Sequence, residues 1–187
     1  MFPFFLILSL IVGIFIAIDD GFPIFFKSYR LGKDGKSFRI YKYRSMMKNA
    51  PDYRNEDGST FNSQEDPRVT RVGKILRKTS LDEIPQLLNI LKGEMSLIGP
   101  RPDLPEDIKI YNKYQKKKLS VRPGITGYSQ AYYRNSISQD LKFDNDAYYS
   151  EHINFLFDLK IFLKTIQSVL GQKNIYTNTK EQTKENI

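Results

Sequence analysis

Hydrophobic residues dominate the start of this chain, where residues 2–18 carry no charge and form no polar face. As a helix rising about 1.5 Å per residue, this segment is about 25 Å long. That length falls short of the roughly 30 Å hydrocarbon core of a bilayer. We therefore predict a helix that is embedded in a membrane without spanning it comfortably. A buried core helix is the alternative, which the lack of a polar face disfavours.

Polar and apolar residues alternate in the next segment. Residues 24–29 and 38–43 predict two amphipathic strands, and the Lys-Asp-Gly-Lys sequence at 33–36 predicts a hairpin turn between them. Residues 49–66 are rich in Asn, Asp, Ser and Gly and contain few aliphatic residues. They predict an exposed, mobile loop.

Helical spacing begins after this loop. Asp66 and Pro67 suit an N-cap and a first helical position. The predicted apolar face of this helix comprises Val72, Ile75 and Leu76.

A second helix is predicted from a Ser-x-x-Glu capping box at residues 80–83. Pro85 lies too close to that cap for a regular helix, because proline removes a backbone hydrogen bond. The helix therefore either kinks or begins late, and it ends at Gly93.

The second half of the chain also reads as mainly helical. Residues 104–119 are a helix candidate, and residues 121–127 predict a turn-rich loop whose glycines allow close backbone approach. Residues 146–170 predict one long amphipathic helix that ends at Gly171. Its apolar stripe comprises Phe155, Leu159, Phe162, Leu163, Ile166 and Leu170.

Composition narrows the possible chemistry. With 187 residues and 40% hydrophobic content, one compact domain is expected. The chain lacks cysteine, which excludes disulfides, thiolate zinc sites and cysteine nucleophiles. His152 is the only histidine and no Gly-x-Ser-x-Gly motif is present, so a serine-histidine triad is set aside and His152 is interpreted as structural.

Positive charge predicts anionic partners, since the formal net charge is +8. Nucleic acid, acidic lipid headgroups and phosphorylated small molecules all qualify. Eight basic residues and one acid lie between positions 27 and 48, directly after the apolar segment. By the positive-inside rule, this side faces the cytoplasm.

Asp82 and Glu83 are the strongest candidates for catalysis. Adjacent helical residues point about 100° apart, so the two carboxylates suit two different tasks. One can attack a phosphorus atom while the other holds a divalent cation, for which magnesium is favoured. Five basic residues at positions 68–78 and Arg101 can bind phosphate. The alternative is that the acids only stabilise a helix N-terminus and the basic residues only face solvent.

The chain closely resembles the bacterial sugar transferases of the monotopic phosphoglycosyl transferase family. The matching stretches are "YKYRSM", "DPRVTRVGKILRKTSLDEIPQLLNILKGEMSLIGPRP", "SVRPGITG" and "FDLKIFLKTI". The resemblance implies an α/β mixed, mainly helical fold in which a small cytoplasmic catalytic domain with a short β-hairpin follows an N-terminal membrane-inserted helix. The corresponding domains are residues 1–20 for the membrane helix, 21–172 for the catalytic domain and 173–187 for a disordered tail.

The resemblance also implies a reaction. A phosphosugar passes from a nucleoside diphosphate sugar, usually a UDP-sugar, to undecaprenyl phosphate, and UMP is released. Asp82 is the implied nucleophile, which forms a covalent phosphosugar-enzyme intermediate, and Glu83 is the implied ligand of Mg²⁺. The residues implied to bind substrate are Arg77, Arg101, Pro102, Arg134, Lys42 and Arg44, of which Lys42 and Arg44 equally suit lipid headgroups.

The N-terminus departs from the family pattern. Pro3 stands where members carry the proline that breaks a re-entrant helix, and the upstream half of that helix is absent. We expect Met1 to be an internal or misassigned start, or the gene to be truncated. A non-catalytic basic membrane-surface module is therefore the alternative function. No nucleic-acid-binding motif is found, while the sugar, the glycan pathway and the oligomeric state remain open.

Overall fold

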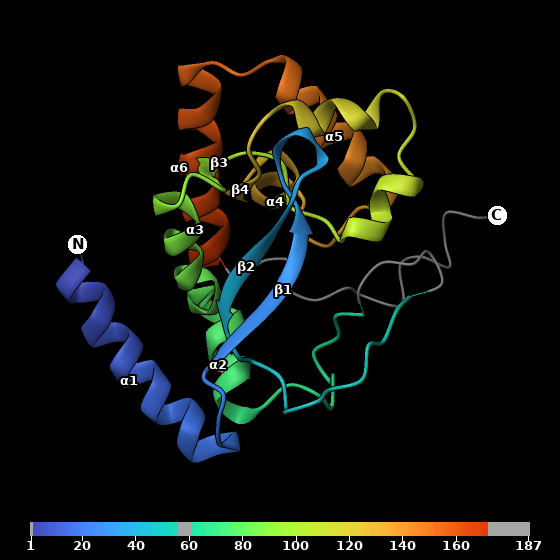
Figure 1. The fold of residues 1–187 in the computed structure, drawn as a ribbon. Coiled ribbons are helices and arrows are strands. Elements are labelled where there is room, and N and C mark those ends of the chain that lie inside the picture. The colour runs from blue at the N-terminus through green and yellow to red at the C-terminus, as the bar shows by residue number, and fades with distance from the viewer. Residues whose placement is uncertain (1, 56–60, 172–187) are drawn as a thin grey trace.

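The computed structural model describes residues 2–55 and 61–171. Residues 56–60 of the predicted loop and the predicted tail at 173–187 lie outside this part of the chain. The prediction of a mixed α/β, mainly helical fold with a short hairpin is confirmed. Figure 1 shows the hairpin running from the helices α1 and α2 at one end to α4, α5 and α6 at the other.

The helix α1 spans Phe2–Asp20. Val12 and Ile16 on one of its faces are buried against Tyr43 of the hairpin and Leu76 of α2. Much of the rest of its surface is apolar and exposed, comprising Leu6, Ile7, Leu10, Ile11, Ile14, Phe15 and Ile18. Within residues 2–55 and 61–171, none of the helices has the length and apolar character that a membrane span requires.

The hairpin consists of β1 (Phe25–Leu31) and β2 (Ser37–Tyr43), which pair antiparallel and are joined by the 3₁₀ turn η1 (Lys33–Gly35). Its strands supply buried residues to three separate core clusters. Tyr43 packs with α1 and α2, Phe38 and Ile40 pack with Met95, and Leu31 packs with Tyr111 and Phe143 of later segments. The hairpin is therefore the element that connects the two ends of the molecule.

The helix α2 begins later than predicted and spans Arg71–Thr79. Asp66 is not its N-cap, because the Asp66 carboxylate accepts hydrogen bonds from the backbone and guanidinium of Arg68. Thr70 caps the helix instead, and its side chain accepts the backbone N–H of Gly73 at 3.0 Å. Leu76 is buried as predicted, whereas Ile75 is exposed.

The prediction of one helix over residues 104–119 is wrong. Two 3₁₀ segments, η3 (Pro105–Lys109) and η4 (Gln115–Ser120), occupy this region. Between them, the side chains of Asn112 and Gln115 accept each other's backbone N–H groups at 2.9 and 3.0 Å. These bonds replace helical hydrogen bonds and stop the helix.

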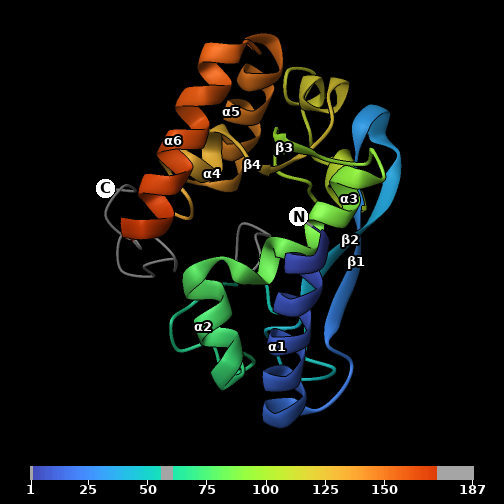
Figure 2. The same ribbon diagram turned by 90° about the vertical axis from the view of Figure 1, so that its left-hand side faces the viewer.

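The prediction of one long helix over residues 146–170 is also wrong. Two helices, α5 (Gln139–Glu151) and α6 (Phe155–Gly171), meet at an angle visible in Figure 2. The Asn154 side chain accepts the backbone N–H of Phe157 at 2.9 Å and so starts a new helix. His152 lies in the break, where its exposed ring stacks on Tyr148. All six residues of the predicted apolar stripe on α6 are exposed.

The loop predicted at residues 121–127 contains a short strand, β4 (Gly124–Thr126), which pairs parallel with β3 (Ser96–Ile98). The short helix α4 (Tyr128–Tyr132) follows it. Close backbone approach at these glycines is confirmed, because a Cβ on Gly124 would lie 2.1 Å from the backbone nitrogen of Gly99. This contact holds the segment before Arg101 against β4.

We expect the Gly124→Ala substitution to lower the free energy of unfolding by about 1–3 kcal/mol, because the added methyl group meets backbone that cannot move aside. Thermal denaturation of both proteins measures the effect. An unchanged melting temperature would show that the β3–β4 contact is looser than the structure indicates.

Candidate active site

Asp82 and Glu83 lie on a 3₁₀ helix, η2 (Leu81–Gln86), and not in an α-helix. Ser80 ends α2 in a left-handed conformation with φ 57°, and its side chain makes no capping bond, so the predicted capping box is wrong. Pro85 lies inside η2, and the α-helix α3 begins late, at Leu87–Leu91. The two carboxylates therefore sit on a short turn that packs against β2.

Lys42 of β2 is an ion-pair partner of Glu83 in this acidic pair. Side chains alternate along a strand, so Phe38, Ile40 and Lys42 share one face of β2. Phe38 and Ile40 are buried on that face, and Lys42 extends beyond them to the dyad. Its ammonium nitrogen lies 2.5 Å from Oε1 of Glu83.

The environment of Glu83 favours its ionised form. Burial is the largest influence and favours the neutral acid, but the positive charges of Lys42 and Arg101, together with hydrogen bonds, outweigh burial and hold the pKa of Glu83 below its ordinary value. Hydrogen bonds from Lys42 and from the buried Gln86 act in the same direction. Glu83 is therefore a carboxylate at neutral pH.

Asp82 has a different environment. Burial raises its pKa to about 6, and the neighbouring charge of Glu83 also raises the pKa, while Lys42 and Arg77 lower it. The two acids therefore titrate apart, as expected for adjacent carboxyl groups with different tasks. At pH 7 most of Asp82 is ionised but weakly solvated, which suits a nucleophile.

Three of the predicted arginines surround the pair. Arg77 of α2 lies within electrostatic reach of Asp82, and its Nε donates to the Ser45 hydroxyl at 3.0 Å. Arg101 lies within electrostatic reach of Glu83. Arg134, at a left-handed turn after α4, is also near Glu83, and burial lowers the pKa of its guanidinium. The structure thus gathers Lys42, Arg77, Arg101 and Arg134 around Asp82 and Glu83.

Arg44 is placed differently. Its buried guanidinium makes five hydrogen bonds, to Pro23, to Met46, to the side chain and carbonyl of Asp20, and to Gly21. These contacts attach the end of α1 to the hairpin. The structure therefore gives Arg44 an anchoring task away from the dyad.

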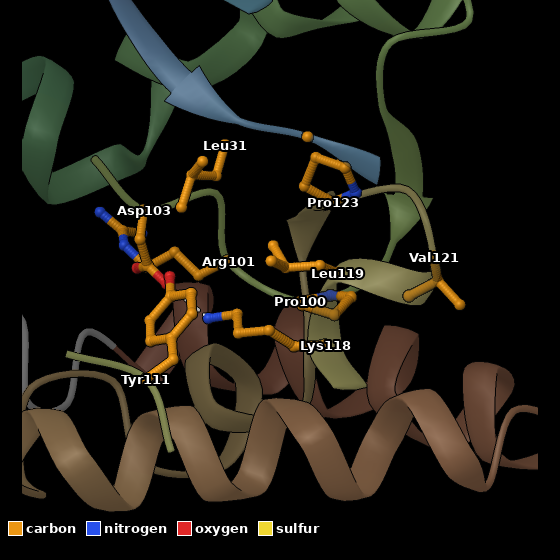
Figure 3. A pocket seen from close by; sticks show the side chains of 10 residues that line it. Leu31, Pro100, Arg101, Asp103, Tyr111, Lys118, Leu119, Val121 and Pro123 are labelled. Carbon is orange, nitrogen blue, oxygen red and sulfur yellow. Dashed lines mark hydrogen bonds and ion pairs between the residues drawn. The ribbon is translucent and has the colours of Figure 1, made fainter. Parts of the chain in front are cut away.

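The turn that carries Arg101 and the buried Pro102 is held by a charge network that the sequence analysis missed. The Asp146 carboxylate accepts the backbone N–H of Arg101 at 3.1 Å. The Lys118 ammonium group donates to both Asp103 and Asp146, at 2.5 and 2.8 Å. Figure 3 shows Lys118 and Asp103 beside Arg101 in the wall of a small pocket.

A divalent cation would have few protein ligands here. In the described part of the chain, no group of three or more His, Cys, Asp or Glu residues gathers around one point. Asp82 and Glu83 nevertheless supply hard oxygen donors, and Glu83 is ionised. Magnesium is commonly held by one or two carboxylates together with substrate phosphates, so the pair fits this ion.

A weakly solvated carboxylate among cationic side chains suits attack on an anionic phosphate group, which is the chemistry of phosphate-group transferases. The comparison with known proteins agrees with this class. The family model of the bacterial sugar transferases matches residues 1–172, and the chain belongs to this family. The prediction of a sugar transferase enzyme is confirmed.

Several relatives are similar over most of this chain. The uncharacterized sugar transferase EpsL of Bacillus subtilis (strain 168) is 41% identical over 160 residues, which cover 86% of this chain and 76% of EpsL. The exopolysaccharide production protein ExoY of Rhizobium meliloti (strain 1021) is 38% identical, covering 90% of this chain and 80% of ExoY.

Longer relatives match over a smaller share of their length. The undecaprenyl-phosphate galactose phosphotransferase of Salmonella typhimurium is 38% identical over 168 residues, covering 84% of this chain and 35% of that protein. The chain thus spans about a third of this relative.

Proposed function

We propose that this protein transfers a phosphosugar from a nucleoside diphosphate sugar, in particular a UDP-sugar, to undecaprenyl phosphate and releases UMP. The observation that carries the proposal is the pair of Asp82 and Glu83 with four cationic side chains around it, of which Lys42 lies 2.5 Å from Oε1 of Glu83. Membership of the bacterial sugar transferase family supports it. Relatives whose names include undecaprenyl-phosphate phosphotransferase support the acceptor.

The reaction has two displacement steps. An oxygen of the Asp82 carboxylate attacks the phosphorus that bears the sugar, and the bond from that phosphorus to the bridging oxygen breaks, so that UMP leaves with the electron pair. A phosphate oxygen of undecaprenyl phosphate then attacks the same phosphorus. The bond to Asp82 breaks and the carboxylate is regenerated.

The surrounding side chains offset the repulsion between a carboxylate and an anionic phosphate. Lys42, Arg77 and Arg101 place positive charge beside the dyad before substrate arrives, so little reorganisation is needed. Glu83 would hold Mg²⁺, which when bound supplies additional charge neutralisation at the phosphate oxygens. Lys42, which contacts Glu83 at 2.5 Å, would add its positive charge beside the same phosphate oxygens.

We also propose that α1 attaches the protein to the bacterial inner membrane, with the catalytic domain on the cytoplasmic face. The exposed apolar face of α1 and the basic segment at 27–48 support this placement. Liposome flotation tests it, and a protein that stays with the unbound fraction would contradict it.

A UMP-release assay tests the proposed reaction. Purified protein is mixed with undecaprenyl phosphate, Mg²⁺ and a panel of UDP-sugars. Repeated turnover that releases UMP from one donor and depends on the lipid phosphate establishes the reaction and identifies the sugar. Absence of release from every donor, with protein that binds liposomes, would contradict the proposal.

The pH dependence follows from the pKa of Asp82. Because Asp82 acts as the carboxylate, kcat/KM is expected to fall as the pH decreases through about 6. Lys42→Met removes the charge that lowers the pKa of both acids. The acid limb of the pH profile, where kcat/KM falls at low pH, should therefore move to higher pH by about one unit or more. Steady-state rates measured from pH 5 to 9 check both expectations.

Lys27→Met is the matched control for this experiment. Lys27 lies on β1 and is exposed, and its ammonium group lies over the Tyr41 ring, 5.8 Å from the ring centroid. Its removal should leave the acid limb where it is in the unaltered protein. An identical limb in the Lys42 and Lys27 variants would show that Lys42 does not set the ionisation of Asp82.

A further inference from the structure

Arg30 of β1 occupies the same face of the hairpin as Lys42. In the antiparallel register, Phe26 pairs with Lys42 and Arg30 pairs with Phe38. Because paired residues point to the same face, Arg30 and Lys42 share the face that meets the dyad. Arg30 lies four residues beyond the partner of Lys42, which is about 13 Å along the strand.

The guanidinium of Arg30 has no protein acceptor among the residues that the structure describes. It is half-buried, and it makes neither a hydrogen bond nor an ion pair there. Two acids lie within its electrostatic reach, Asp103 and Asp107. Both have other partners: Asp103 binds Lys118 and the Tyr111 hydroxyl, and Asp107 accepts the backbone N–H of Leu104.

Figure 3 shows that Asp103 turns toward Tyr111 and Lys118 in the pocket wall.

The N–H donors of the Arg30 guanidinium are accessible to solvent. In the described ranges, the buried side-chain atoms without a partner are Gln130 Oε1 and Asp146 Oδ1, and no nitrogen of Arg30 is among them. Its N–H groups therefore reach solvent, where a ligand can bind them.

The Arg30 side chain also lies within electrostatic reach of another guanidinium, that of Arg101. The backbone N–H of Leu31 donates to the carbonyl of Asp103 at 2.8 Å, which fixes the end of β1 beside the Arg101 turn. Burial and the positive charge of Arg101 both lower the pKa of Arg30, and Arg54 adds repulsion of the same sign. An arrangement of like charges without a bridging carboxylate is stabilised when an anion binds between them.

We propose that Arg30 and Arg101 form a phosphate-binding site that extends the active site along the hairpin. Arg101 links the acidic pair to the Arg30 site, because it lies within electrostatic reach of both Glu83 and Arg30. The assignment of this site rests on the proposed function: it binds the phosphate of the leaving nucleoside monophosphate. The phosphate that bears the sugar lies at Asp82, and this second phosphate lies on the side of Arg30.

Direct binding tests the site without requiring turnover. The affinities for UMP and for inorganic phosphate are measured by calorimetry on the full chain and on Arg30→Gln, Arg30→Lys and Arg39→Gln. Arg39 is the matched control, because it is an exposed arginine on the opposite face of the same hairpin that contacts Tyr29. Arg30→Gln should weaken UMP binding by about tenfold or more.

The conservative variant and the kinetic constants complete the test. Arg30→Lys should retain part of the affinity, because it keeps the charge and loses the planar fork. In turnover, Arg30→Gln should raise the KM for the UDP-sugar and leave the KM for undecaprenyl phosphate unchanged. If Arg30→Gln instead raises the KM for undecaprenyl phosphate and leaves the KM for the UDP-sugar unchanged, the assignment to the leaving nucleotide is wrong and the site binds the phosphate of the lipid acceptor.

Two results distinguish a failure of the Arg30 site from a failure of the proposed reaction. If Arg30→Gln and Arg39→Gln bind UMP and phosphate equally well and neither KM differs between them, the Arg30 site is refuted whatever the reaction. If UMP binding weakens selectively in Arg30→Gln but no UDP-sugar is turned over by the unaltered protein, the binding site stands and the proposed reaction fails.

Discussion

Asp82→Asn is expected to abolish turnover, with a loss on the order of 10⁴-fold or more, as when the nucleophile of a covalent mechanism is removed. The asparagine amide carries no negative charge and cannot form the acyl phosphate. Because burial already disfavours the charged form of Asp82, the neutral amide should not lower the melting temperature. UMP release and thermal denaturation, measured on the same preparation, check both expectations.

The matched control is Asp34→Asn in the hairpin turn. Asp34 is exposed and has a φ of 58°, a conformation that asparagine tolerates equally well. This variant should keep full activity. If Asp82→Asn retained UMP release close to that of Asp34→Asn, Asp82 would not be the nucleophile.

Lys118→Met is expected to have the largest effect on stability, lowering the free energy of unfolding by about 3–5 kcal/mol. Lys118 is 3% exposed and binds the carboxylates of Asp103 and Asp146, which would remain buried without a cation. Burial already raises the pKa of Asp146. Its protonation at low pH would remove the uncompensated charge, so the loss should be smaller at pH 5 than at pH 8.

Lys117→Met is the control, since it removes the same charge from the neighbouring position. Lys117 pairs with Glu151, and its side chain is 48% exposed. An exposed pair of this kind contributes about 0–1 kcal/mol. Equal melting temperatures for the two variants would show that the Lys118 network does not hold the fold together.

The hairpin, and the proximity of several candidate side chains to one another, were largely predictable from the sequence. Alternation of polar and apolar residues placed both strands within a residue or two at each end. The order of residues around Asp82 and Glu83 pointed to the acidic pair, and the nearby Arg77 and the more distant Arg101 and Arg134 do approach it.

Helix boundaries were harder to predict, because local side-chain bonds decide them. Thr70 rather than Asp66 caps α2, and Asn154 divides the predicted C-terminal helix. Periodicity continues across such positions, since the apolar face of the next helix often keeps a similar spacing. A single asparagine or threonine therefore changes where a helix begins without changing the apolar periodicity of the sequence.

The sequence pattern also could not predict which groups the individual basic residues bind. Arg44 and Lys118 both lie in runs of positive charge, yet both are buried and bind protein groups. Arg30 lies in a similar run but leaves its guanidinium open toward Arg101. The difference depends on long-range packing of the hairpin against the Arg101 turn, which local spacing does not encode.

The most direct test of the proposed mechanism is intact-protein mass spectrometry after incubation with the UDP-sugar identified by UMP release, in the absence of undecaprenyl phosphate. We expect a mass increase equal to one phosphosugar, located by peptide analysis at Asp82 and lost when undecaprenyl phosphate is added. The Asp82→Asn variant should show no increase. An unmodified protein that releases UMP only when both substrates are present, or an adduct on another residue, would contradict covalent catalysis by Asp82.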